Sequence, residues 1–179
     1  MAEEAPLFAT QKGHVVTFTD GSGTPIVYTF RVSPDGWTET PKRQRADVEA
    51  TDTDGVVVAV RKEGAITKHP EVTFTNLRIH SCHLGSTAIS GSAGSLLALV
   101  RGTGPSGWTS TDTARAPDHV TGTLLITTPD AGTAKGESRS NAKARLVDEN
   151  LEEKTDPKGR FFPSIRFVCI DEPTITVNS

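Results

Sequence analysis

Residues 15–33 read VVTFTDGSGTPIVYTFRVS, and this stretch carries the clearest structural signal in the chain. Every second position in its later part holds a large apolar residue: Ile26, Tyr28, Phe30 and Val32. Alternation of this kind is typical of a β-strand that buries one face. Residues 20–25, just before it, are rich in Asp, Gly, Ser and Pro, which favour turns or cannot donate to a β-ladder. The stretch therefore predicts two antiparallel strands, at residues 15–19 and 26–33, joined by a turn.

Three segments in the middle of the chain also have strand patterns. Residues 56–60 read VVVAV, and a short β-branched run favours a strand that is covered on both sides. In residues 71–84 the apolar positions switch phase near Asn76, which predicts a bulge or a change of sheet. Residues 120–127 favour another strand, after a loop in which Trp108 is the large apolar anchor.

The C-terminal part of the chain predicts two more strands. Residues 144–151 have a strand pattern that runs into a charged segment. Residues 161–170 alternate, and the face expected to be buried holds Phe161, Ile165, Phe167 and Cys169. Together, the segments give seven or eight strands.

One short helix is expected, after the Gly- and Ser-rich residues 85–95. Its apolar residues recur at helical spacing and form the expected core face: Leu96, Leu97, Leu99 and Val100. Ser95 is placed to cap the N-terminus, and Gly102 is placed to end the helix. We expect this helix to pack on the sheets rather than to contact a ligand, so that alanine at either Leu97 or Leu99 lowers the melting temperature.

The composition fits a mainly β protein with long loops. The 179 residues include 16 glycines and 11 prolines, which favours a β-sandwich or barrel-like fold over a helical bundle. We expect one domain, residues 1–179, with an extended loop or arm at about residues 34–55. The net charge of −3 supplies no general cationic field, which disfavours tight binding to nucleic acid through its phosphates.

The sequence predicts a soluble, cytosolic protein with reduced cysteines. No apolar run approaches the roughly 18 residues that a membrane span needs, and the acidic start, residues 1–5, lacks the pattern of a signal peptide. Cys82 and Cys169 lie in apolar stretches. A reducing cytosol favours two buried thiols over a disulfide.

The motifs that resemble chemical sites have simpler interpretations, so we expect neither an enzyme nor a cofactor. Residues 102–107 match G-x-G-x-x-G, but they follow a helix instead of joining a strand to one, which favours a turn. Asp52–Gly55 resembles part of a calcium loop but lacks the outer ligands. His80, Cys82 and His83 cannot converge on a metal from a regular strand. No G-x-S-x-G elbow is present.

The order of these features resembles the major tail tube proteins of long-tailed bacteriophages. The resemblance covers most of residues 15–127. It rests on VTFTDGSGTPIVYTF at 16–30, DGWTETPKR at 35–43, EVTFTNLRI from 71, SLLALVRGTG at 95–104, Trp108 and VTGTLLI at 120–126. These are patterns of strand, turn and helix, and it is their shared order that indicates the family. The resemblance implies a β-sandwich with one helix and long loops.

The resemblance also implies a structural function in the virion tail. Subunits of this family assemble in the host cytoplasm into hexameric rings, and the stacked rings form the conduit for DNA delivery. The implied partners are further copies of the chain and the tape measure, tail terminator and tail-tip proteins. Double-stranded DNA passes without specific binding, and no membrane is involved. A net charge of −3 agrees with a bore that repels phosphate within a Debye length of about 8–10 Å.

Three other classes of protein share the β-rich pattern. An inner-tube protein of a contractile tail or secretion device has the same fold and ring logic. A capsid decoration or connector protein is also β-rich. A carbohydrate-binding β-sandwich is the most distant alternative, with Trp37 and Trp108 as stacking platforms.

Two oppositely charged segments are the candidate contacts between subunits. The basic segment supplies Lys42, Arg43 and Arg45, and the acidic segment, residues 148–156, supplies Asp148, Glu149, Glu152 and Glu153, together with Asp156. As a hypothesis, the basic segment of one subunit meets the acidic segment of a neighbour and sets the register. Reversing the three basic charges to Glu is expected to slow tube elongation.

Overall fold

The computed structural model describes residues 13–32, 36–40, 44–45, 48–51, 53–61, 66–114, 120–128, 137–157 and 159–177. Strands are the main secondary structure, and the described part contains one short α-helix, so the mainly β class is confirmed. Fourteen strands are present in these ranges instead of seven or eight. The additional strands are short and lie at sheet edges and in a projecting hairpin.

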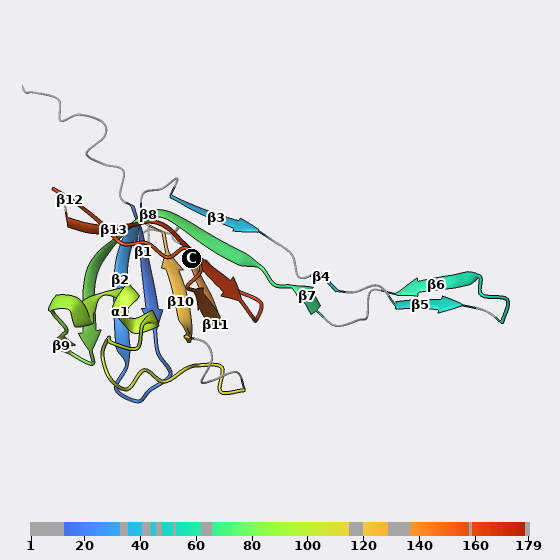
Figure 1. Ribbon diagram of the computed structural model, residues 1–179, viewed down its shortest axis with the longest axis horizontal. Helices are drawn as coiled ribbons and strands as arrows, with labels where there is room; N and C mark the ends of the chain where they lie inside the picture. Colours follow the sequence, from blue (N-terminus) through green and yellow to red (C-terminus); the bar gives the residue numbers. More distant parts are fainter. Residues whose placement is uncertain are drawn as a thin grey trace, which may run out of the picture.

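Six strands close into an antiparallel barrel: β1 (His14–Thr19), β2 (Ile26–Val32), β8 (Glu71–Leu84), β13 (Gly159–Cys169), β11 (Glu137–Val147) and β10 (Thr121–Thr127). Each strand pairs with the next in this order, and β10 pairs with β1 to complete the circle (Figure 1). Closure gives each of the six strands a hydrogen-bonded neighbour on both sides. The two strands expected first from the sequence form the hairpin β1–β2, with Phe18 opposite Tyr28.

Aromatic and branched side chains fill the barrel. The four alternating residues of β2 are at most 2% exposed, which confirms that prediction. Phe18 packs against Phe167 and Trp108, with ring centroids 5.0 and 5.1 Å away. The Trp108 indole also donates a hydrogen bond to the Thr121 carbonyl at 3.0 Å. Trp108 therefore anchors its loop on the barrel, as the sequence predicts.

The phase switch expected near Asn76 is confirmed, and it extends to the neighbouring strand. Asn76 has a left-handed φ of 52°, and the pairing of β8 with β13 stays in register on both sides of it. Pro163, which has no N–H to donate, lies across from Asn76 in this register. Both strands therefore change their inward phase at the same place. As a result Phe162 is fully buried and Phe161 only partly, so the prediction that Phe161 shares the buried face was wrong.

The strand expected at residues 144–151 is shifted toward the N-terminus. Its observed form, β11, begins at Glu137, in a small polar stretch, and ends at Val147. Beyond it, the Leu151 amide donates to the Asp148 carbonyl, and Asn150 has a φ of 62°. This turn ends the strand and brings the chain back to the barrel.

Short strands extend the sheet beyond the barrel. β3 (Trp37–Thr40) pairs with β8 in line with β2, and β14 (Thr174–Val177) pairs with β11 in line with β13. β12 (Lys154–Asp156) pairs with β13, and β9 (Thr87–Ala88) pairs with β8. These four strands have one partner each and so form the edges of the sheet in the described part of the chain.

A long hairpin, here called the arm, projects from the barrel between β3 and β8 (Figure 1). Its paired strands are β4 (Gln44–Arg45) with β7 (Ile66–Lys68), and β5 (Val48–Thr51) with β6 (Val57–Arg61). The arm therefore lies later in the chain than the predicted 34–55, because β3 belongs to the main sheet. The expected strand near Val56 exists, but Val56 and Val57 are 58% and 46% exposed. The prediction that it is covered on both sides was wrong there, since β6 belongs to a two-stranded ribbon.

The helix α1 (Leu96–Val100) follows a 3-10 turn, η2 (Gly91–Gly94). Ser95 is its N-cap and accepts a hydrogen bond from the Leu97 amide, and Gly102 follows with a φ of 69°. Both predicted end signals are confirmed. Of the residues expected to face the core, Leu96 and Leu99 are buried in it, whereas Leu97 and Val100 are partly buried and pack against it.

The two leucines at the middle of the helix are expected to differ in their effect on stability. Leu99→Ala removes a buried side chain and is expected to lower the free energy of unfolding by about 2–5 kcal/mol. Leu97→Ala is expected to cost less, because part of that side chain already contacts water. Urea unfolding of both variants checks this order, and equal losses would contradict the burial pattern.

Both cysteines are free and buried, as predicted. Burial raises the pKa of the Cys169 thiol to about 12, and it also raises the pKa of Cys82 above its ordinary value. The thiolate is the reactive form of cysteine, so neither thiol is expected to react in the folded protein near neutral pH. Among the described residues, no helix is long and apolar enough to cross a membrane.

Candidate assembly surfaces

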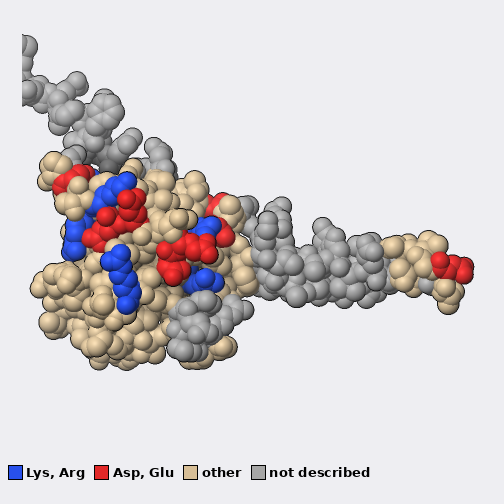
Figure 2. All heavy atoms as spheres, in the orientation of Figure 1, with Lys and Arg blue, Asp and Glu red and all other residues tan. Residues whose placement is uncertain are grey.

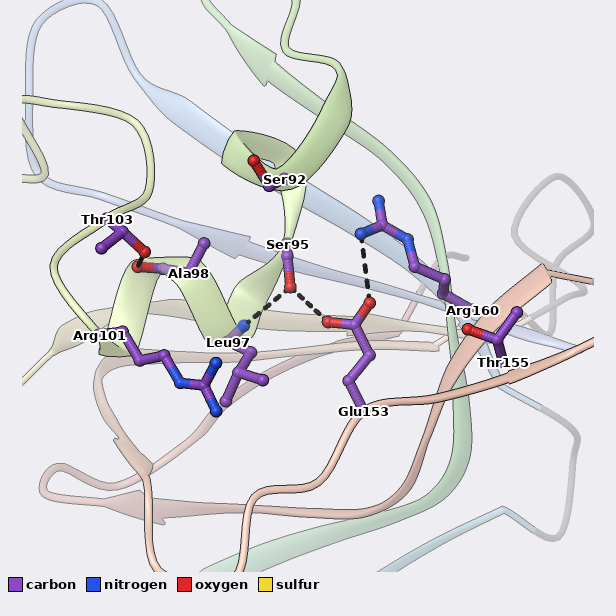
Figure 3. A pocket seen from close by; sticks show the side chains of 9 residues that line it. All are labelled: Ser92, Ser95, Leu97, Ala98, Arg101, Thr103, Glu153, Thr155 and Arg160. Atoms are coloured by element: carbon purple, nitrogen blue, oxygen red, sulfur yellow. Dashed lines mark hydrogen bonds and ion pairs between the residues drawn. The ribbon is translucent and has the colours of Figure 1, made fainter.

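A shallow pocket of about 360 Å³ lies between helix α1 and strands β12 and β13 (Figure 3). Glu153 is the central residue of this pocket. It accepts a hydrogen bond from the Ser95 hydroxyl and forms an ion pair of 3.2 Å with Arg160. Ser95 also caps the helix, so the three residues join helix α1 to the strand pair β12–β13. Figure 3 shows Ser95 and Arg160 both pointing toward the Glu153 carboxylate.

The chemistry of this pocket is that of a structural clamp. Ser95 is buried and uses its oxygen to cap the helix, and the described residues that line the pocket include no histidine to act as its base. The Glu153 carboxylate is neutralised by Arg160, which fixes its position. Arg101, at the helix C-cap, lines the same pocket from the other side. The contacts in the pocket therefore join helix α1 to strands β12 and β13.

Removing the Ser95 hydroxyl tests the clamp. Ser95→Ala is expected to lower the free energy of unfolding by about 1 kcal/mol, because the helix loses its N-cap and Glu153 loses a donor. Ser92→Ala is the matched control, since Ser92 lines the same pocket. That change is expected to stay within about 0.5 kcal/mol, as for most surface positions. Equal effects in urea unfolding would show that the clamp does not contribute.

Most carboxylates of the acidic segment form ion pairs within the same chain. Its ion pairs are Glu149 with Arg166, Glu152 with Lys154, Glu153 with Arg160, and Asp156 with Arg78. The last pair is bidentate, at 3.0 and 2.5 Å. Asp148 is exposed and has no ion pair of its own among those seen in the described part. Figure 2 shows acidic and basic side chains side by side on this face of the barrel.

These ion pairs bear on the predicted contact between the basic segment and the acidic segment. Lys42 and Arg43 lie outside the described residues, and Arg45 lies in β4 with its side chain outside the description. The contact between basic and acidic segments therefore stays a prediction. Its expected effect is small, because the acidic partners already have cations and exposed ion pairs contribute about 0–1 kcal/mol each. Glu153 is only 12% exposed and is held by the clamp.

The structure places His80 and Cys82 of β8, which the sequence suggested as possible metal ligands, in different surroundings. Cys82 is buried in the barrel core, whereas His80 is exposed. Within the ranges that the structure describes, no three His, Cys, Asp or Glu side chains are grouped so that they could hold a metal ion.

Four of the five large exposed hydrophobic residues in the described part lie on two elements, the arm and β14. The large exposed hydrophobic residues in the described part are Val56, Val57, Leu84, Ile175 and Val177. The first two belong to the arm, and the last two belong to β14. Sequence reasoning did not single out β14, although its sequence TITV combines high β-propensity with a lack of charge. That combination is the signal that could have found it.

A partly buried ion pair that the sequence did not predict holds β3 in place. Arg139 of β11 donates to Glu39 of β3, and the two side chains are only 17% and 16% exposed. The two strands are not neighbours in the sheet. The pair therefore crosses one end of the barrel and fixes β3, from which the chain continues toward the arm.

Comparison of the chain with protein families, curated proteins and solved structures found no match.

Proposed function

We propose that this chain is the structural subunit of a phage tail tube, which assembles into stacked hexameric rings that form a conduit for DNA delivery. The observation that carries the proposal is the arm. A two-stranded ribbon is at best marginally stable in water when nothing covers it. The β5–β6 ribbon projects from the barrel and exposes Val56 and Val57, so it is built to be completed by a partner (Figure 1).

The fold supports self-association as the purpose of the arm. The exposed apolar residues of the arm and of β14 lie at different places on one subunit. Contacts between unlike surfaces of identical subunits run head to tail, and they generate rings or filaments. This is the kind of contact that a tube requires. The tail-tube form of the β-sandwich, which the resemblance implies, is part of the same proposal.

The remaining expectations belong to this proposal as well. The subunit acts without catalysis in the virion tail, after assembly in the host cytoplasm. It meets the tape measure, tail terminator and tail-tip proteins, and double-stranded DNA passes through without specific binding. The paired charges on the barrel surface agree with a protein that does not attract phosphate strongly.

Sedimentation velocity and negative-stain electron microscopy of the purified chain, at rising concentration, test the proposal. We expect rings with sixfold symmetry that stack into tubes. A chain that stays monomeric at high concentration, even with tail-initiation proteins supplied, would contradict it. Separate rings that never stack would favour a connector or decoration protein instead.

A further inference from the structure

We infer that strand β14 is the surface that receives the arm of a second copy of the chain, with Val56 and Val57 of one subunit packing on Ile175 and Val177 of the next. This inference rests on the proposed self-assembly and deepens it, since it names the two surfaces that meet. The first observation concerns the edge strands of the main sheet. A strand at an edge presents unpaired N–H and C=O groups that can pair with another chain.

Among the described edge strands longer than two residues, β14 is the one that lacks protection. Soluble proteins blunt their edges with charged residues, with proline or with a covering segment. β12 carries Lys154 and Asp156, and β3 carries Glu39, which is held by Arg139. β14 has only threonine, isoleucine and valine, and all four of its residues are exposed. An edge of this composition calls for a covering partner.

The apolar side chains of β14 lie on one face of the strand. Ile175 pairs with Arg139 of β11, and Val177 pairs with Glu137, two residues apart in each strand. Residues two apart in a strand point to the same side. The two side chains are 52% and 64% exposed, so together they form a small apolar ridge beside the open edge.

The arm provides a matching surface. It is a ribbon with open edges, and Figure 2 shows an acidic spot at its far end. The exposed apolar residues next to the turn are Val56 and Val57, and Val57 is the first residue of strand β6. Two β-branched side chains on the ribbon can therefore meet two on the β14 edge, and the ribbon can add its strands to the sheet.

The geometry makes the partner a second copy. From the pair Thr40–Glu71, where β3 and β8 run together, about 14 residues lead out to the turn of the arm, which is a reach of roughly 45 Å. Figure 1 shows the arm pointing away from its own barrel. Because the end of the arm lies away from the barrel to which β14 belongs, the contact is made between molecules and repeats from one subunit to the next.

Cross-linking between singly substituted chains tests the contact directly. Val56→Cys or Val57→Cys chains are mixed with Ile175→Cys or Val177→Cys chains, allowed to assemble, and treated with a short bismaleimide. We expect a covalent dimer in at least one of the four mixtures. Leu84→Cys, another exposed apolar position, replaces the β14 variant as the control and is expected to give none. The native cysteines are buried, and the unsubstituted chain checks that they stay silent.

Charge substitution on β14 gives a second readout. The double variant Ile175→Lys, Val177→Lys is expected to raise the concentration needed for assembly by about tenfold or more, because it places two cations in an apolar contact. Thr174→Lys, Thr176→Lys is the matched control on the other face of the same strand and is expected to have a much smaller effect. All four positions are exposed, so both variants should fold, and thermal melts confirm it.

The outcomes separate the inference from the proposed function. If the unsubstituted chain forms tubes but no mixture cross-links, and the lysine variant on the apolar face assembles normally, β14 does not receive the arm. In that case another surface does, and the proposed function stands. If the unsubstituted chain stays monomeric under all conditions, both are overturned.

Discussion

A chain that lacks the arm is expected to fold and to lose assembly. The change replaces residues 41–68 with an Asn-Gly turn. It keeps His69 and Pro70, because the Pro70 carbonyl accepts a hydrogen bond from the Cys169 amide. Thr40 and Glu71 are paired neighbours in the sheet, so a short connection can join them. Two valines contribute about 1.5 kcal/mol or more each when they are buried. Their loss alone corresponds to roughly a hundredfold higher concentration for assembly.

Sedimentation velocity and electron microscopy measure this loss, and a thermal melt shows that the barrel is intact. The matched variant keeps the arm but carries Val56→Ser and Val57→Ser, and it is expected to be impaired in the same direction. Tubes of normal length from the shortened chain would rule out the arm as the means of assembly. An unfolded shortened chain would show instead that the arm supports the barrel, and the serine variant then decides the question.

Phe162→Ala is expected to be among the most destabilising single changes in the barrel. The side chain is fully buried, in register with Leu77 of β8. Truncating a buried phenylalanine costs about 3–5 kcal/mol, which corresponds to a melting temperature lower by roughly 6–20 °C in a chain of this size. Thermal unfolding followed by circular dichroism measures the change.

Phe161 provides the matched control on the same strand. Its ring is partly exposed and lies under the Arg78 guanidinium, 5.3 Å from the ring centroid. Phe161→Ala is therefore expected to cost much less than Phe162→Ala. The sequence pattern predicts the opposite order, so the comparison tests the shared phase switch of β8 and β13. A larger loss for Phe161→Ala would restore the pattern that the sequence indicates.

The ion pairs of the acidic segment could not be predicted from the sequence. In the sequence, residues 148–156 have the pattern of an unpaired acidic surface. In the structure, their carboxylates form ion pairs with lysine and arginine side chains of β8, β12 and β13. Arg78 is far from Asp156 in the chain and becomes its partner only because β12 folds back along β13, which pairs with β8. Charge counts along a sequence do not contain that information.

Local signals in the sequence were enough to predict the mainly β class, the β1–β2 hairpin, the buried face of β2 and both ends of helix α1. These features depend on residues a few positions apart, through side-chain alternation and capping. Closure of the barrel, the burial of Phe162, the Glu39–Arg139 pair and the open edge at β14 could be seen only in the folded chain. Each depends on which distant strands become neighbours, and pairing between distant strands is fixed by how the whole sheet buries its apolar face.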